Sequence, residues 1–398
     1  MKKTISLLFL TFNLAWLASC GEKSELTVVS SISLNETNLL LSISEEYPLV
    51  ATIIIENGTE IDPTWTSSNN SIVTVNDTGL VTALSAGNAI VTATAGEKSA
   101  QCKITVNAFW SKKANFAGGK RMQAVSFSIG NKGYIGTGAS GIYANDPKLK
   151  DFWEYDPQSN TWTQKADFAG GNRKQAIGFS IGDKGYIGTG LDENNNRCQD
   201  FWEYDPQTNT WTQKADFAGG GRILAVGFSI GNKGYVGTGL GVGDNQDFWE
   251  YDPELNVWTR KADFLGKIRY QAVGFSIENK GYIGTGRDEK SWDNDFWEYD
   301  PDSNVWTQKA DFLGKKRYQA VGFSIGNKGY IGTGSDGTGG SCQDFWEYNP
   351  ATNAWAQKAK CIGEDRGAAV GFTIGNKSYV GTGYFYNILF GDFWEFSP

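Results

Sequence analysis

One stretch decides the fold of this chain, residues 176–215, which read AIGFSIGDKGYIGTGLDENNNRCQDFWEYDPQTNTWTQKA. Short apolar segments alternate with turns rich in Gly, Asp, Asn and Pro, a pattern typical of short β-strands. The small residues of the first segment suit a crowded axis. We expect four strands, A to D in chain order, at Ala176–Ile181, Tyr186–Gly190, Asp200–Tyr204 and Trp211–Ala215.

The same pattern returns along the chain. The string Asp-Phe-Trp-Glu recurs every 47 to 49 residues, at Asp151, Asp200, Asp247, Asp295, Asp344 and Asp392. A tryptophan marks strand D of each unit, at Trp110, Trp162, Trp211, Trp258, Trp306 and Trp355. A period near 48 residues with four strands per unit is typical of a β-propeller. We therefore predict an all-β chain with a six-bladed propeller over residues 108–398.

The two ends of the repeat region predict how the ring closes. Its first fragment, around Trp110, is a lone strand D, and its last unit stops after a strand C at Asp392–Phe396. Pairing them completes a sixth blade from both ends and leaves no unpaired sheet edge. We expect a propeller closed three-plus-one.

The six units resemble the Kelch repeat family. The shared features are an arginine that opens each unit, an aromatic residue followed by glycine in strand B, a Tyr-Asp-Pro turn and the strand D tryptophan. The chain departs from the family pattern after strand B, where Gly-Thr-Gly replaces adjacent glycines. The resemblance implies a Kelch-type propeller.

Residues 25–107 predict a separate small β domain, with alternating apolar and polar residues and many Val, Ile and Thr. The segments Trp65–Asn69, Gly79–Ala83 and Ile90–Ala93 resemble the bacterial immunoglobulin-like group 2 family. This resemblance implies a β-sandwich that serves as a spacer or adhesion module. We expect Trp65 in the core between its sheets rather than as a ligand platform.

The amino terminus predicts export and lipidation. Lys2 and Lys3 precede an apolar run that is too short to span a bilayer. The sequence Leu17-Ala18-Ser19-Cys20 resembles the bacterial lipobox, which implies cleavage before Cys20 and acylation of Cys20. We expect a signal peptide at 1–19, a tether at 20–24, and a protein anchored by lipid outside the cytoplasm, at the outer membrane or cell surface. The alternative is an ordinary signal peptide in which Cys20 has no role.

The amino-acid composition limits the partners and the reactions that are possible for this chain. With 36 Lys and Arg against 44 Asp and Glu, the chain carries a net charge of −8. It therefore lacks the positive surface that a phosphate backbone requires, and we expect no nucleic-acid partner. The chain contains no histidine, which excludes imidazole catalysis and nearly every catalytic zinc or copper site. We expect no metal and no cofactor. Catalysis by carboxylates alone remains open.

Strand order predicts two faces for the propeller. The B–C and D–A loops share one, the loop face, and the A–B and C–D turns share the other, the turn face. The immunoglobulin-like domain should enter strand D from the turn face, so the loop face can point away from the membrane.

Six arginines open the units on the loop face: Arg121, Arg173, Arg222, Arg269, Arg317 and Arg366. The Kelch resemblance implies that such arginines approach the channel mouth and contact acidic ligands, carboxylates or sulfated glycans. The alternative is that each arginine pairs with a nearby acid, such as the Asp before Phe-Trp, and braces the blades. Repetition in all six units favours the brace.

The B–C loops vary in length and content, and loops on a rigid scaffold usually carry specificity. They lie at 139–150, 191–199, 240–246, 287–294, 335–343 and 384–391. Their aromatic residues are candidate stacking surfaces for a sugar or a protein partner, at Tyr143, Trp292, Tyr384, Phe385 and Tyr386. Tyr270 and Tyr318, each directly after a unit arginine, extend this candidate surface toward the mouth. The alternative is that these aromatics fold back on their own blades.

Two cysteines form a candidate disulfide. Cys342 precedes strand C of the fifth complete unit, and Cys361 follows its strand D, where other units have Phe. The two positions lie opposite each other across the C–D hairpin, and export permits oxidation.

Three functions are compatible with these features. We rank first a non-catalytic, monomeric surface lipoprotein whose loop face binds a protein or glycan. A carbohydrate-active Kelch enzyme, such as a sialic-acid mutarotase, is the second, because arginine and glutamate suffice for that chemistry. A purely structural spacer is the third.

Overall fold

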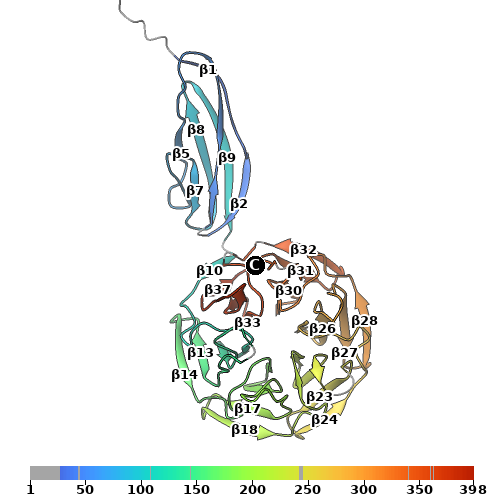
Figure 1. Ribbon diagram of the computed structural model, residues 1–398. Helices are drawn as coiled ribbons and strands as arrows, with labels where there is room; N and C mark the ends of the chain where they lie inside the picture. The colour runs from blue at the N-terminus through green and yellow to red at the C-terminus, as the bar shows by residue number, and fades with distance from the viewer. Residues whose placement is uncertain are drawn as a thin grey trace, which may run out of the picture.

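The computed structural model describes residues 27–43, 45–107, 109–143, 145–241, 245–338, 340–358, 360–361 and 363–398. Throughout these ranges the regular elements are β-strands, and no helix is long and apolar enough to cross a membrane. An elongated β-sandwich precedes a ring of blades (Figure 1). The predicted lipobox, Cys20 and tether lie outside the described residues.

Nine strands build the sandwich: β1 (Val28–Leu34), β2 (Asn38–Ser42), β3 (Glu46–Pro48), β4 (Ala51–Asn57), β5 (Thr64–Ser67), β6 (Val73–Val75), β7 (Leu80–Ala83), β8 (Gly87–Ala95) and β9 (Lys98–Asn107). They form sheets in the orders β2-β9-β8-β5, β3-β7-β6 and β1-β4. The core holds Leu41, Val81, Val91 and Ile104, and Trp65 packs against it. The core position predicted for Trp65 is therefore confirmed.

The ring consists of six four-stranded sheets, as predicted. Blade 1 consists of β11 (Val125–Ile129), β12 (Lys132–Gly136), β13 (Phe152–Asp156) and β14 (Thr161–Lys165). Blade 2 consists of β15 (Ile177–Ile181), β16 (Lys184–Gly188), β17 (Phe201–Asp205) and β18 (Thr210–Lys214). Blade 3 consists of β20 (Val226–Ile230), β21 (Lys233–Gly237), β23 (Phe248–Asp252) and β24 (Val257–Arg260).

Blades 4 to 6 repeat the order. They are β25 (Val273–Ile277), β26 (Lys280–Gly284), β27 (Phe296–Asp300) and β28 (Val305–Lys309); β29 (Val321–Ile325), β30 (Lys328–Gly332), β31 (Phe345–Asn349) and β32 (Ala354–Lys358); and β33 (Val370–Ile374), β34 (Lys377–Gly381), β37 (Phe393–Phe396) and β10 (Trp110–Lys112). Two short hairpins stand on the loop face, β19 (Arg222–Ile223) with β22 (Leu240–Gly241), and β35 (Tyr384–Phe385) with β36 (Ile388–Leu389).

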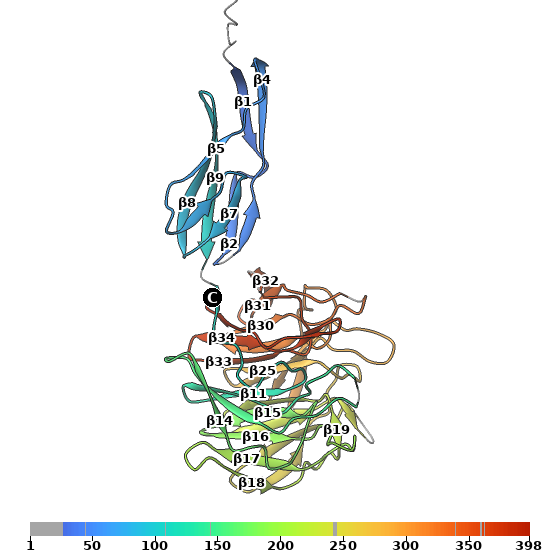
Figure 2. The same ribbon diagram turned by 60° about the vertical axis from the view of Figure 1, so that its left-hand side comes forward.

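The ring closes three-plus-one, as predicted. Strand β10 pairs with β37, with Trp110 opposite Phe396. Trp110 is fully buried, and its ring lies 4.9 Å from those of Phe345 and Phe396. The sandwich joins the propeller at this blade (Figure 1 and Figure 2). Strand β10 begins opposite the end of β37, which lies on the turn face. The chain therefore enters the propeller from the turn face, as predicted.

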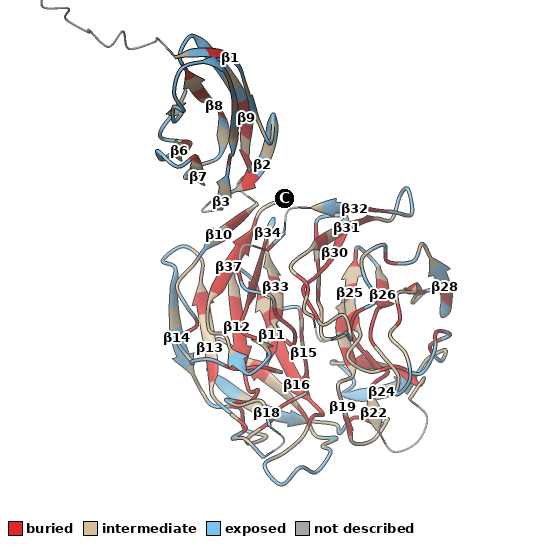
Figure 3. Ribbon diagram, turned by 45° about the horizontal axis from the view of Figure 1, so that its top comes forward, coloured by how far each residue is buried: buried red, intermediate tan, exposed pale blue. Residues whose placement is uncertain are grey.

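Aromatic residues lock neighbouring blades together. Phe152 of blade 1 lies 4.8 Å from Tyr204 and 5.1 Å from Trp211 of blade 2, both edge-on, a geometry that adds to simple burial. Gly185 of blade 2 also lets the two blades pack closely, since a Cβ there would come within 2.3 Å of Phe127 of blade 1. Figure 3 shows the buried segments along the inner strands and the exposed ones on the outer strands and loops.

The structure corrects one predicted strand. Strand B of blade 2 was expected at Tyr186–Gly190, but β16 covers Lys184–Gly188. Thr189 and Gly190 have φ of 61° and 88°, so the backbone leaves the extended conformation two residues early.

Candidate functional site

The six unit arginines are internal braces. Their side chains are at most 2% exposed, and each guanidinium forms two parallel hydrogen bonds with the Asp that precedes Phe-Trp in the same blade. In blade 4, Arg269 reaches Asp295 at 2.6 and 2.7 Å and also donates to the carbonyl of Thr285 at 2.9 Å. The bracing alternative is therefore correct.

The prediction that the six unit arginines contact a ligand is wrong, because their side chains are buried and paired. Arg121, Arg173, Arg222, Arg269, Arg317 and Arg366 offer no free guanidinium edge to a ligand. Burial works against the charge of Asp295, Asp344 and Asp392, yet hydrogen bonds and charge from the paired arginines hold the pKa of these carboxyls below its ordinary value.

The predicted disulfide is wrong, because Cys342 and Cys361 are both free thiols. Cys361 is 2% exposed and joins the buried cluster around Trp110, a cluster that does not include Cys342. Burial raises the pKa of the Cys361 thiol to about 11. In the other blades a Phe in this slot stacks on the unit arginine, whereas Phe390 takes that role here, 4.7 Å from Arg366.

A ring of backbone hydrogen bonds surrounds the channel mouth on the loop face. The residue two places after each unit arginine donates its N–H to the carbonyl of the equivalent residue in the preceding blade, at 3.0 to 3.2 Å. The ring residues are Gln123, Gln175, Leu224, Gln271, Gln319 and Ala368, with φ between 52° and 59°. They enclose a cavity of about 170 Å³ and present four glutamine amides.

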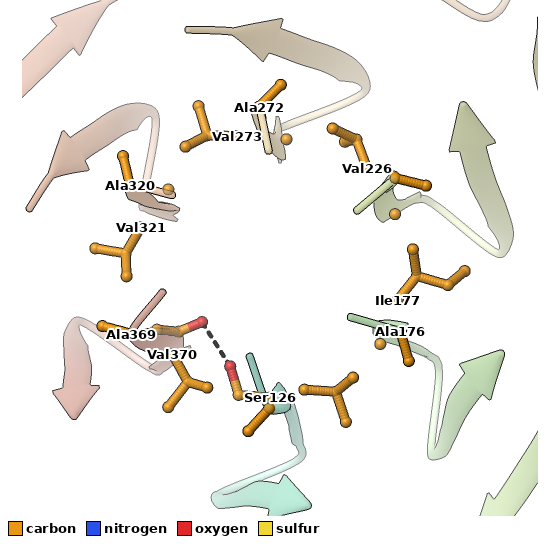
Figure 4. Close-up of a pocket in the computed structure, with 18 residues that line it drawn as sticks. Ser126, Ala176, Ile177, Val226, Ala272, Val273, Ala320, Val321, Ala369 and Val370 are labelled. Atoms are coloured by element: carbon orange, nitrogen blue, oxygen red, sulfur yellow. Dashed lines mark hydrogen bonds between the residues drawn. The ribbon is translucent and has the colours of Figure 1, made fainter. Parts of the chain in front are cut away.

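Below the mouth, the channel is narrow and lined by small residues. A cavity of about 210 Å³ is bordered by an Ala, a Val or Ile and a Gly from each of blades 2 to 6, and by Ala124, Val125 and Ser126 of blade 1. Figure 4 looks into it, and Ser126 is the hydroxyl residue at a level where the other five blades have glycine. Its Oγ donates to the carbonyl of Gly371 at 3.1 Å.

Beside the mouth, one arginine is held in a different way. The guanidinium of Arg287 lies 5.2 Å from the ring centre of Tyr270 and 5.0 Å from that of Tyr318. Its Nε donates to the hydroxyl of Tyr270 at 3.0 Å. Among the residues that the structure describes, no carboxylate forms an ion pair with Arg287. We refer to Arg287, Tyr270 and Tyr318 as the arginine clamp.

Tyr384 extends the clamp toward the mouth. Its main chain pairs with Gly367, and its hydroxyl donates to Oε1 of Gln319 in blade 5 at 3.3 Å. Burial, reinforced by the neighbouring Tyr318, raises the pKa of Tyr384 above its ordinary value. The clamp, Tyr384 and the mouth glutamines thus form one half-buried polar surface on blades 4 to 6.

The predicted aromatic candidates divide into two groups. Tyr270, Tyr318 and Tyr384 come together at this surface. Tyr143 is 68% exposed on the loop of blade 1, and the ring of Trp292 packs against Gly337 of blade 5. The Phe385 and Tyr386 rings contact each other with their centres 4.2 Å apart and their planes tilted by 53°, at the β35–β36 hairpin.

The sequence interpretation did not single out Arg287, Gln271 or Gln319, which the structure places at or beside the mouth. One signal was available for Arg287. The residue after Gly-Thr-Gly varies among the blades, being Ala139, Leu191, Leu240, Arg287, Ser335 and Tyr384. An arginine there, without an acid at a fixed spacing, has no counterpart in the brace. In the part of the chain described here, no cluster of acidic or cysteine side chains suits a metal ion.

Comparison with known proteins identifies the sandwich. Residues 28–106 match the bacterial Ig-like domain (group 2) family. A solved structure entitled "Structure of YjhT" superposes with a TM-score of 0.61, covering 70% of this chain and 95% of that one at 17% sequence identity. This likeness supports the propeller fold.

Curated relatives match over a shorter stretch. The N-acetylneuraminate epimerases of Yersinia pestis (strain Pestoides F) and Yersinia pseudotuberculosis serotype O:1b (strain IP 31758) are each 40% identical over 60 residues. That match spans 14% of this chain and 15% of each relative. The expectation of a non-catalytic protein is corrected by this similarity, since the relatives carry the names of enzymes.

Proposed function

We propose that this protein is an enzyme that acts on a sugar acid of the N-acetylneuraminate type and interconverts its two anomers at the channel mouth. The observation that carries the proposal is the arginine clamp, a half-buried cation beside an open mouth with no carboxylate partner among the described residues. The partial similarity to N-acetylneuraminate epimerases supports the same substrate class.

Arg287 binds the carboxylate of the sugar acid. Tyr270 occupies its Nε, which leaves the two terminal nitrogens to donate in parallel to the two carboxylate oxygens. The rings of Tyr270 and Tyr318 hold the guanidinium on its faces, so little freedom is lost on binding. The amides of Gln271 and Gln319 suit the hydroxyl and N-acetyl groups of such a sugar.

Interconversion of anomers requires two proton transfers. The anomeric hydroxyl loses a proton while the ring oxygen gains one, the ring opens, and it recloses on the other face with both transfers reversed. Tyr384 is the donor to the ring oxygen, because its hydroxyl lies beside the mouth glutamine Gln319 and a phenol is protonated at neutral pH. Solvent water, which the open mouth admits, takes the proton of the anomeric hydroxyl.

Exchange NMR of N-acetylneuraminate tests this proposal. The wild-type protein should accelerate exchange between the anomers, and Arg287→Ala should bring the rate back to that of buffer. Leu191→Ala is the matched control, since Leu191 occupies the same place in blade 2. An unaccelerated wild-type sample, or an Arg287→Ala variant as active as the control, would show that the proposal is wrong.

We also propose that the six units are Kelch repeats and that Cys20 is acylated, which leaves the protein anchored outside the cytoplasm with its sandwich as a spacer. The repeated arginine, Tyr-Asp-Pro turn and strand D tryptophan support the first point, and Leu17–Cys20 supports the second. Metabolic labelling with a fatty acid should mark the wild-type protein and fail to mark Cys20→Ala.

A further inference from the structure

A cavity of about 560 Å³ opens on the loop face between blades 3 and 4. Its volume lies within the range of small-molecule sites. Leu240 and Gln246 line it from the B–C loop of blade 3, and Lys267, Ile268 and Tyr270 from the chain that enters blade 4. The lining mixes aliphatic, aromatic, amide and charged groups, a combination that suits a sugar ring with its apolar faces and polar edge.

The cavity and the arginine clamp share a wall. Tyr270 lines the cavity, and the same side chain stacks on Arg287 and accepts its Nε–H at 3.0 Å. A ligand held by Arg287 therefore lies one tyrosine ring away from the cavity.

Lys267 lines the cavity and forms an ion pair with a buried carboxylate. Its Nζ lies 3.5 Å from Oδ1 of Asp293, whose side chain is 6% exposed. Oδ2 of Asp293 forms no hydrogen bond within the described residues and lies 3.9 Å from Arg269. The Lys267 side chain is 67% exposed, so this ion pair biases the ammonium toward the cavity wall without fixing it there.

This wall differs from its counterpart in the first three blades and resembles that of blade 5, where Lys315-Lys316 precede Arg317 and Lys315 pairs with Asp336 at 3.0 Å. The pair Lys267-Ile268 stands directly before Arg269, whereas the equivalent pairs in blades 1 to 3 are Gly119-Lys120, Gly171-Asn172 and Gly220-Gly221. Blade 4 therefore carries long side chains where the first three blades have at least one glycine.

We infer that the cavity binds a second sugar residue, joined to the acid that Arg287 holds. This inference rests on the proposed function. Interconversion of anomers needs a free anomeric hydroxyl on the acid, so the second residue must be joined through another hydroxyl of that acid. The substrate is then an oligosaccharide with an acidic sugar at its reducing end, and the cavity is the subsite for the next residue.

The test compares N-acetylneuraminate with its α2,8-linked dimer, by exchange NMR and by calorimetric titration. The wild-type protein should turn over the dimer with a kcat/KM about ten-fold above that of the monomer. Ile268→Trp fills the cavity from a site that is already 47% exposed, and it should remove this advantage while the monomer rate stays unchanged. Lys316→Trp, one position before Arg317, is the matched control and should behave as wild type.

Equal kcat/KM values for the two sugars, or an Ile268→Trp variant that keeps the preference, would overturn the inference. If neither sugar exchanges faster than in buffer, the proposed function fails, and the titration alone decides the subsite. Tighter binding of the dimer by wild type, lost in Ile268→Trp, would support it. Equal affinities of both sugars for wild type would overturn it.

Discussion

Two arginines of blade 4 show how one residue type serves two purposes in this propeller. Arg269 is fully buried and forms two parallel hydrogen bonds with Asp295. Arg287 is half-buried between two tyrosines and has no ion-pair partner in the described ranges. The first has an equivalent in every blade and the second has none. Repetition therefore marks what holds the ring together, and departure from the repeat marks the site.

The largest expected effect is a difference in the stability that the protein loses when each of these two arginines is replaced. Arg269→Ala leaves the carboxylate of Asp295, which is 22% exposed, without its cation, and we expect a loss of about 3 kcal/mol in the free energy of unfolding. Arg287→Ala should cost only about 1 kcal/mol, because it removes two cation–π contacts and one hydrogen bond but leaves no buried charge without a partner. Urea denaturation of both variants measures the difference. Equal losses would remove the distinction between the two arginines.

Acid should weaken the brace and leave the clamp untouched. Asp295, Asp344 and Asp392 have lowered pKa values in the folded protein. Their stabilising effect is complete above the unfolded pKa of about 3.9 and is lost as the pH falls through the folded pKa. The free energy of unfolding should therefore be insensitive to these groups near neutral pH and fall below about pH 4.

A matched variant isolates this contribution. Asp295→Asn should flatten the acid limb of the stability profile relative to wild type, by removing one of the titrating carboxyls. A profile of unchanged steepness would show that Asp295 does not contribute to it.

Loss of one ring of the arginine clamp should have a smaller effect, mainly on the binding of substrate. Tyr318→Leu removes one of the two rings that hold Arg287, a contact of about 0.5–2 kcal/mol. We expect KM for the sugar acid to rise about three- to ten-fold while kcat changes less. Exchange NMR at several sugar concentrations separates the two constants, and an unchanged KM would contradict the clamp.

The smallest effect concerns the departure from the Kelch pattern. Thr285 and its five equivalents have φ between 57° and 61° and a buried hydroxyl without a hydrogen-bond partner among the described groups. A β-branched residue is strained in this conformation, which glycine adopts freely. The free energy gained when the backbone strain is relieved should slightly exceed the free energy lost when a methyl group is no longer buried. Thr285→Gly should therefore stabilise the folded protein by about 0.5 kcal/mol. Thermal unfolding measures the sign, and a clear decrease would show that packing outweighs strain.

The sequence predicted the six blades, their closure through Trp110 and the sandwich, because each rests on a periodic or local pattern. Strand B was placed two residues too late, since Thr189 carries a backbone angle that a β-branched residue rarely adopts. The disulfide failed because Cys361 turns into the core and Phe390 replaces the missing ring.

The site was harder to predict than the fold. Tyr270 and Tyr318 were identified as candidates from their position after the unit arginines. Arg287 was not, because its role depends on a contact between two blades that no spacing encodes. The glutamines of the mouth were missed for the same reason, since only ring closure brings them together.

Calorimetric titration of N-acetylneuraminate into wild type and Arg287→Ala tests the central distinction most directly. The account predicts that the dissociation constant rises at least about ten-fold in Arg287→Ala, with a melting temperature that falls far less than in Arg269→Ala. Equal affinity in both proteins would contradict it, because the arginine of the clamp would then have no part in binding the acid.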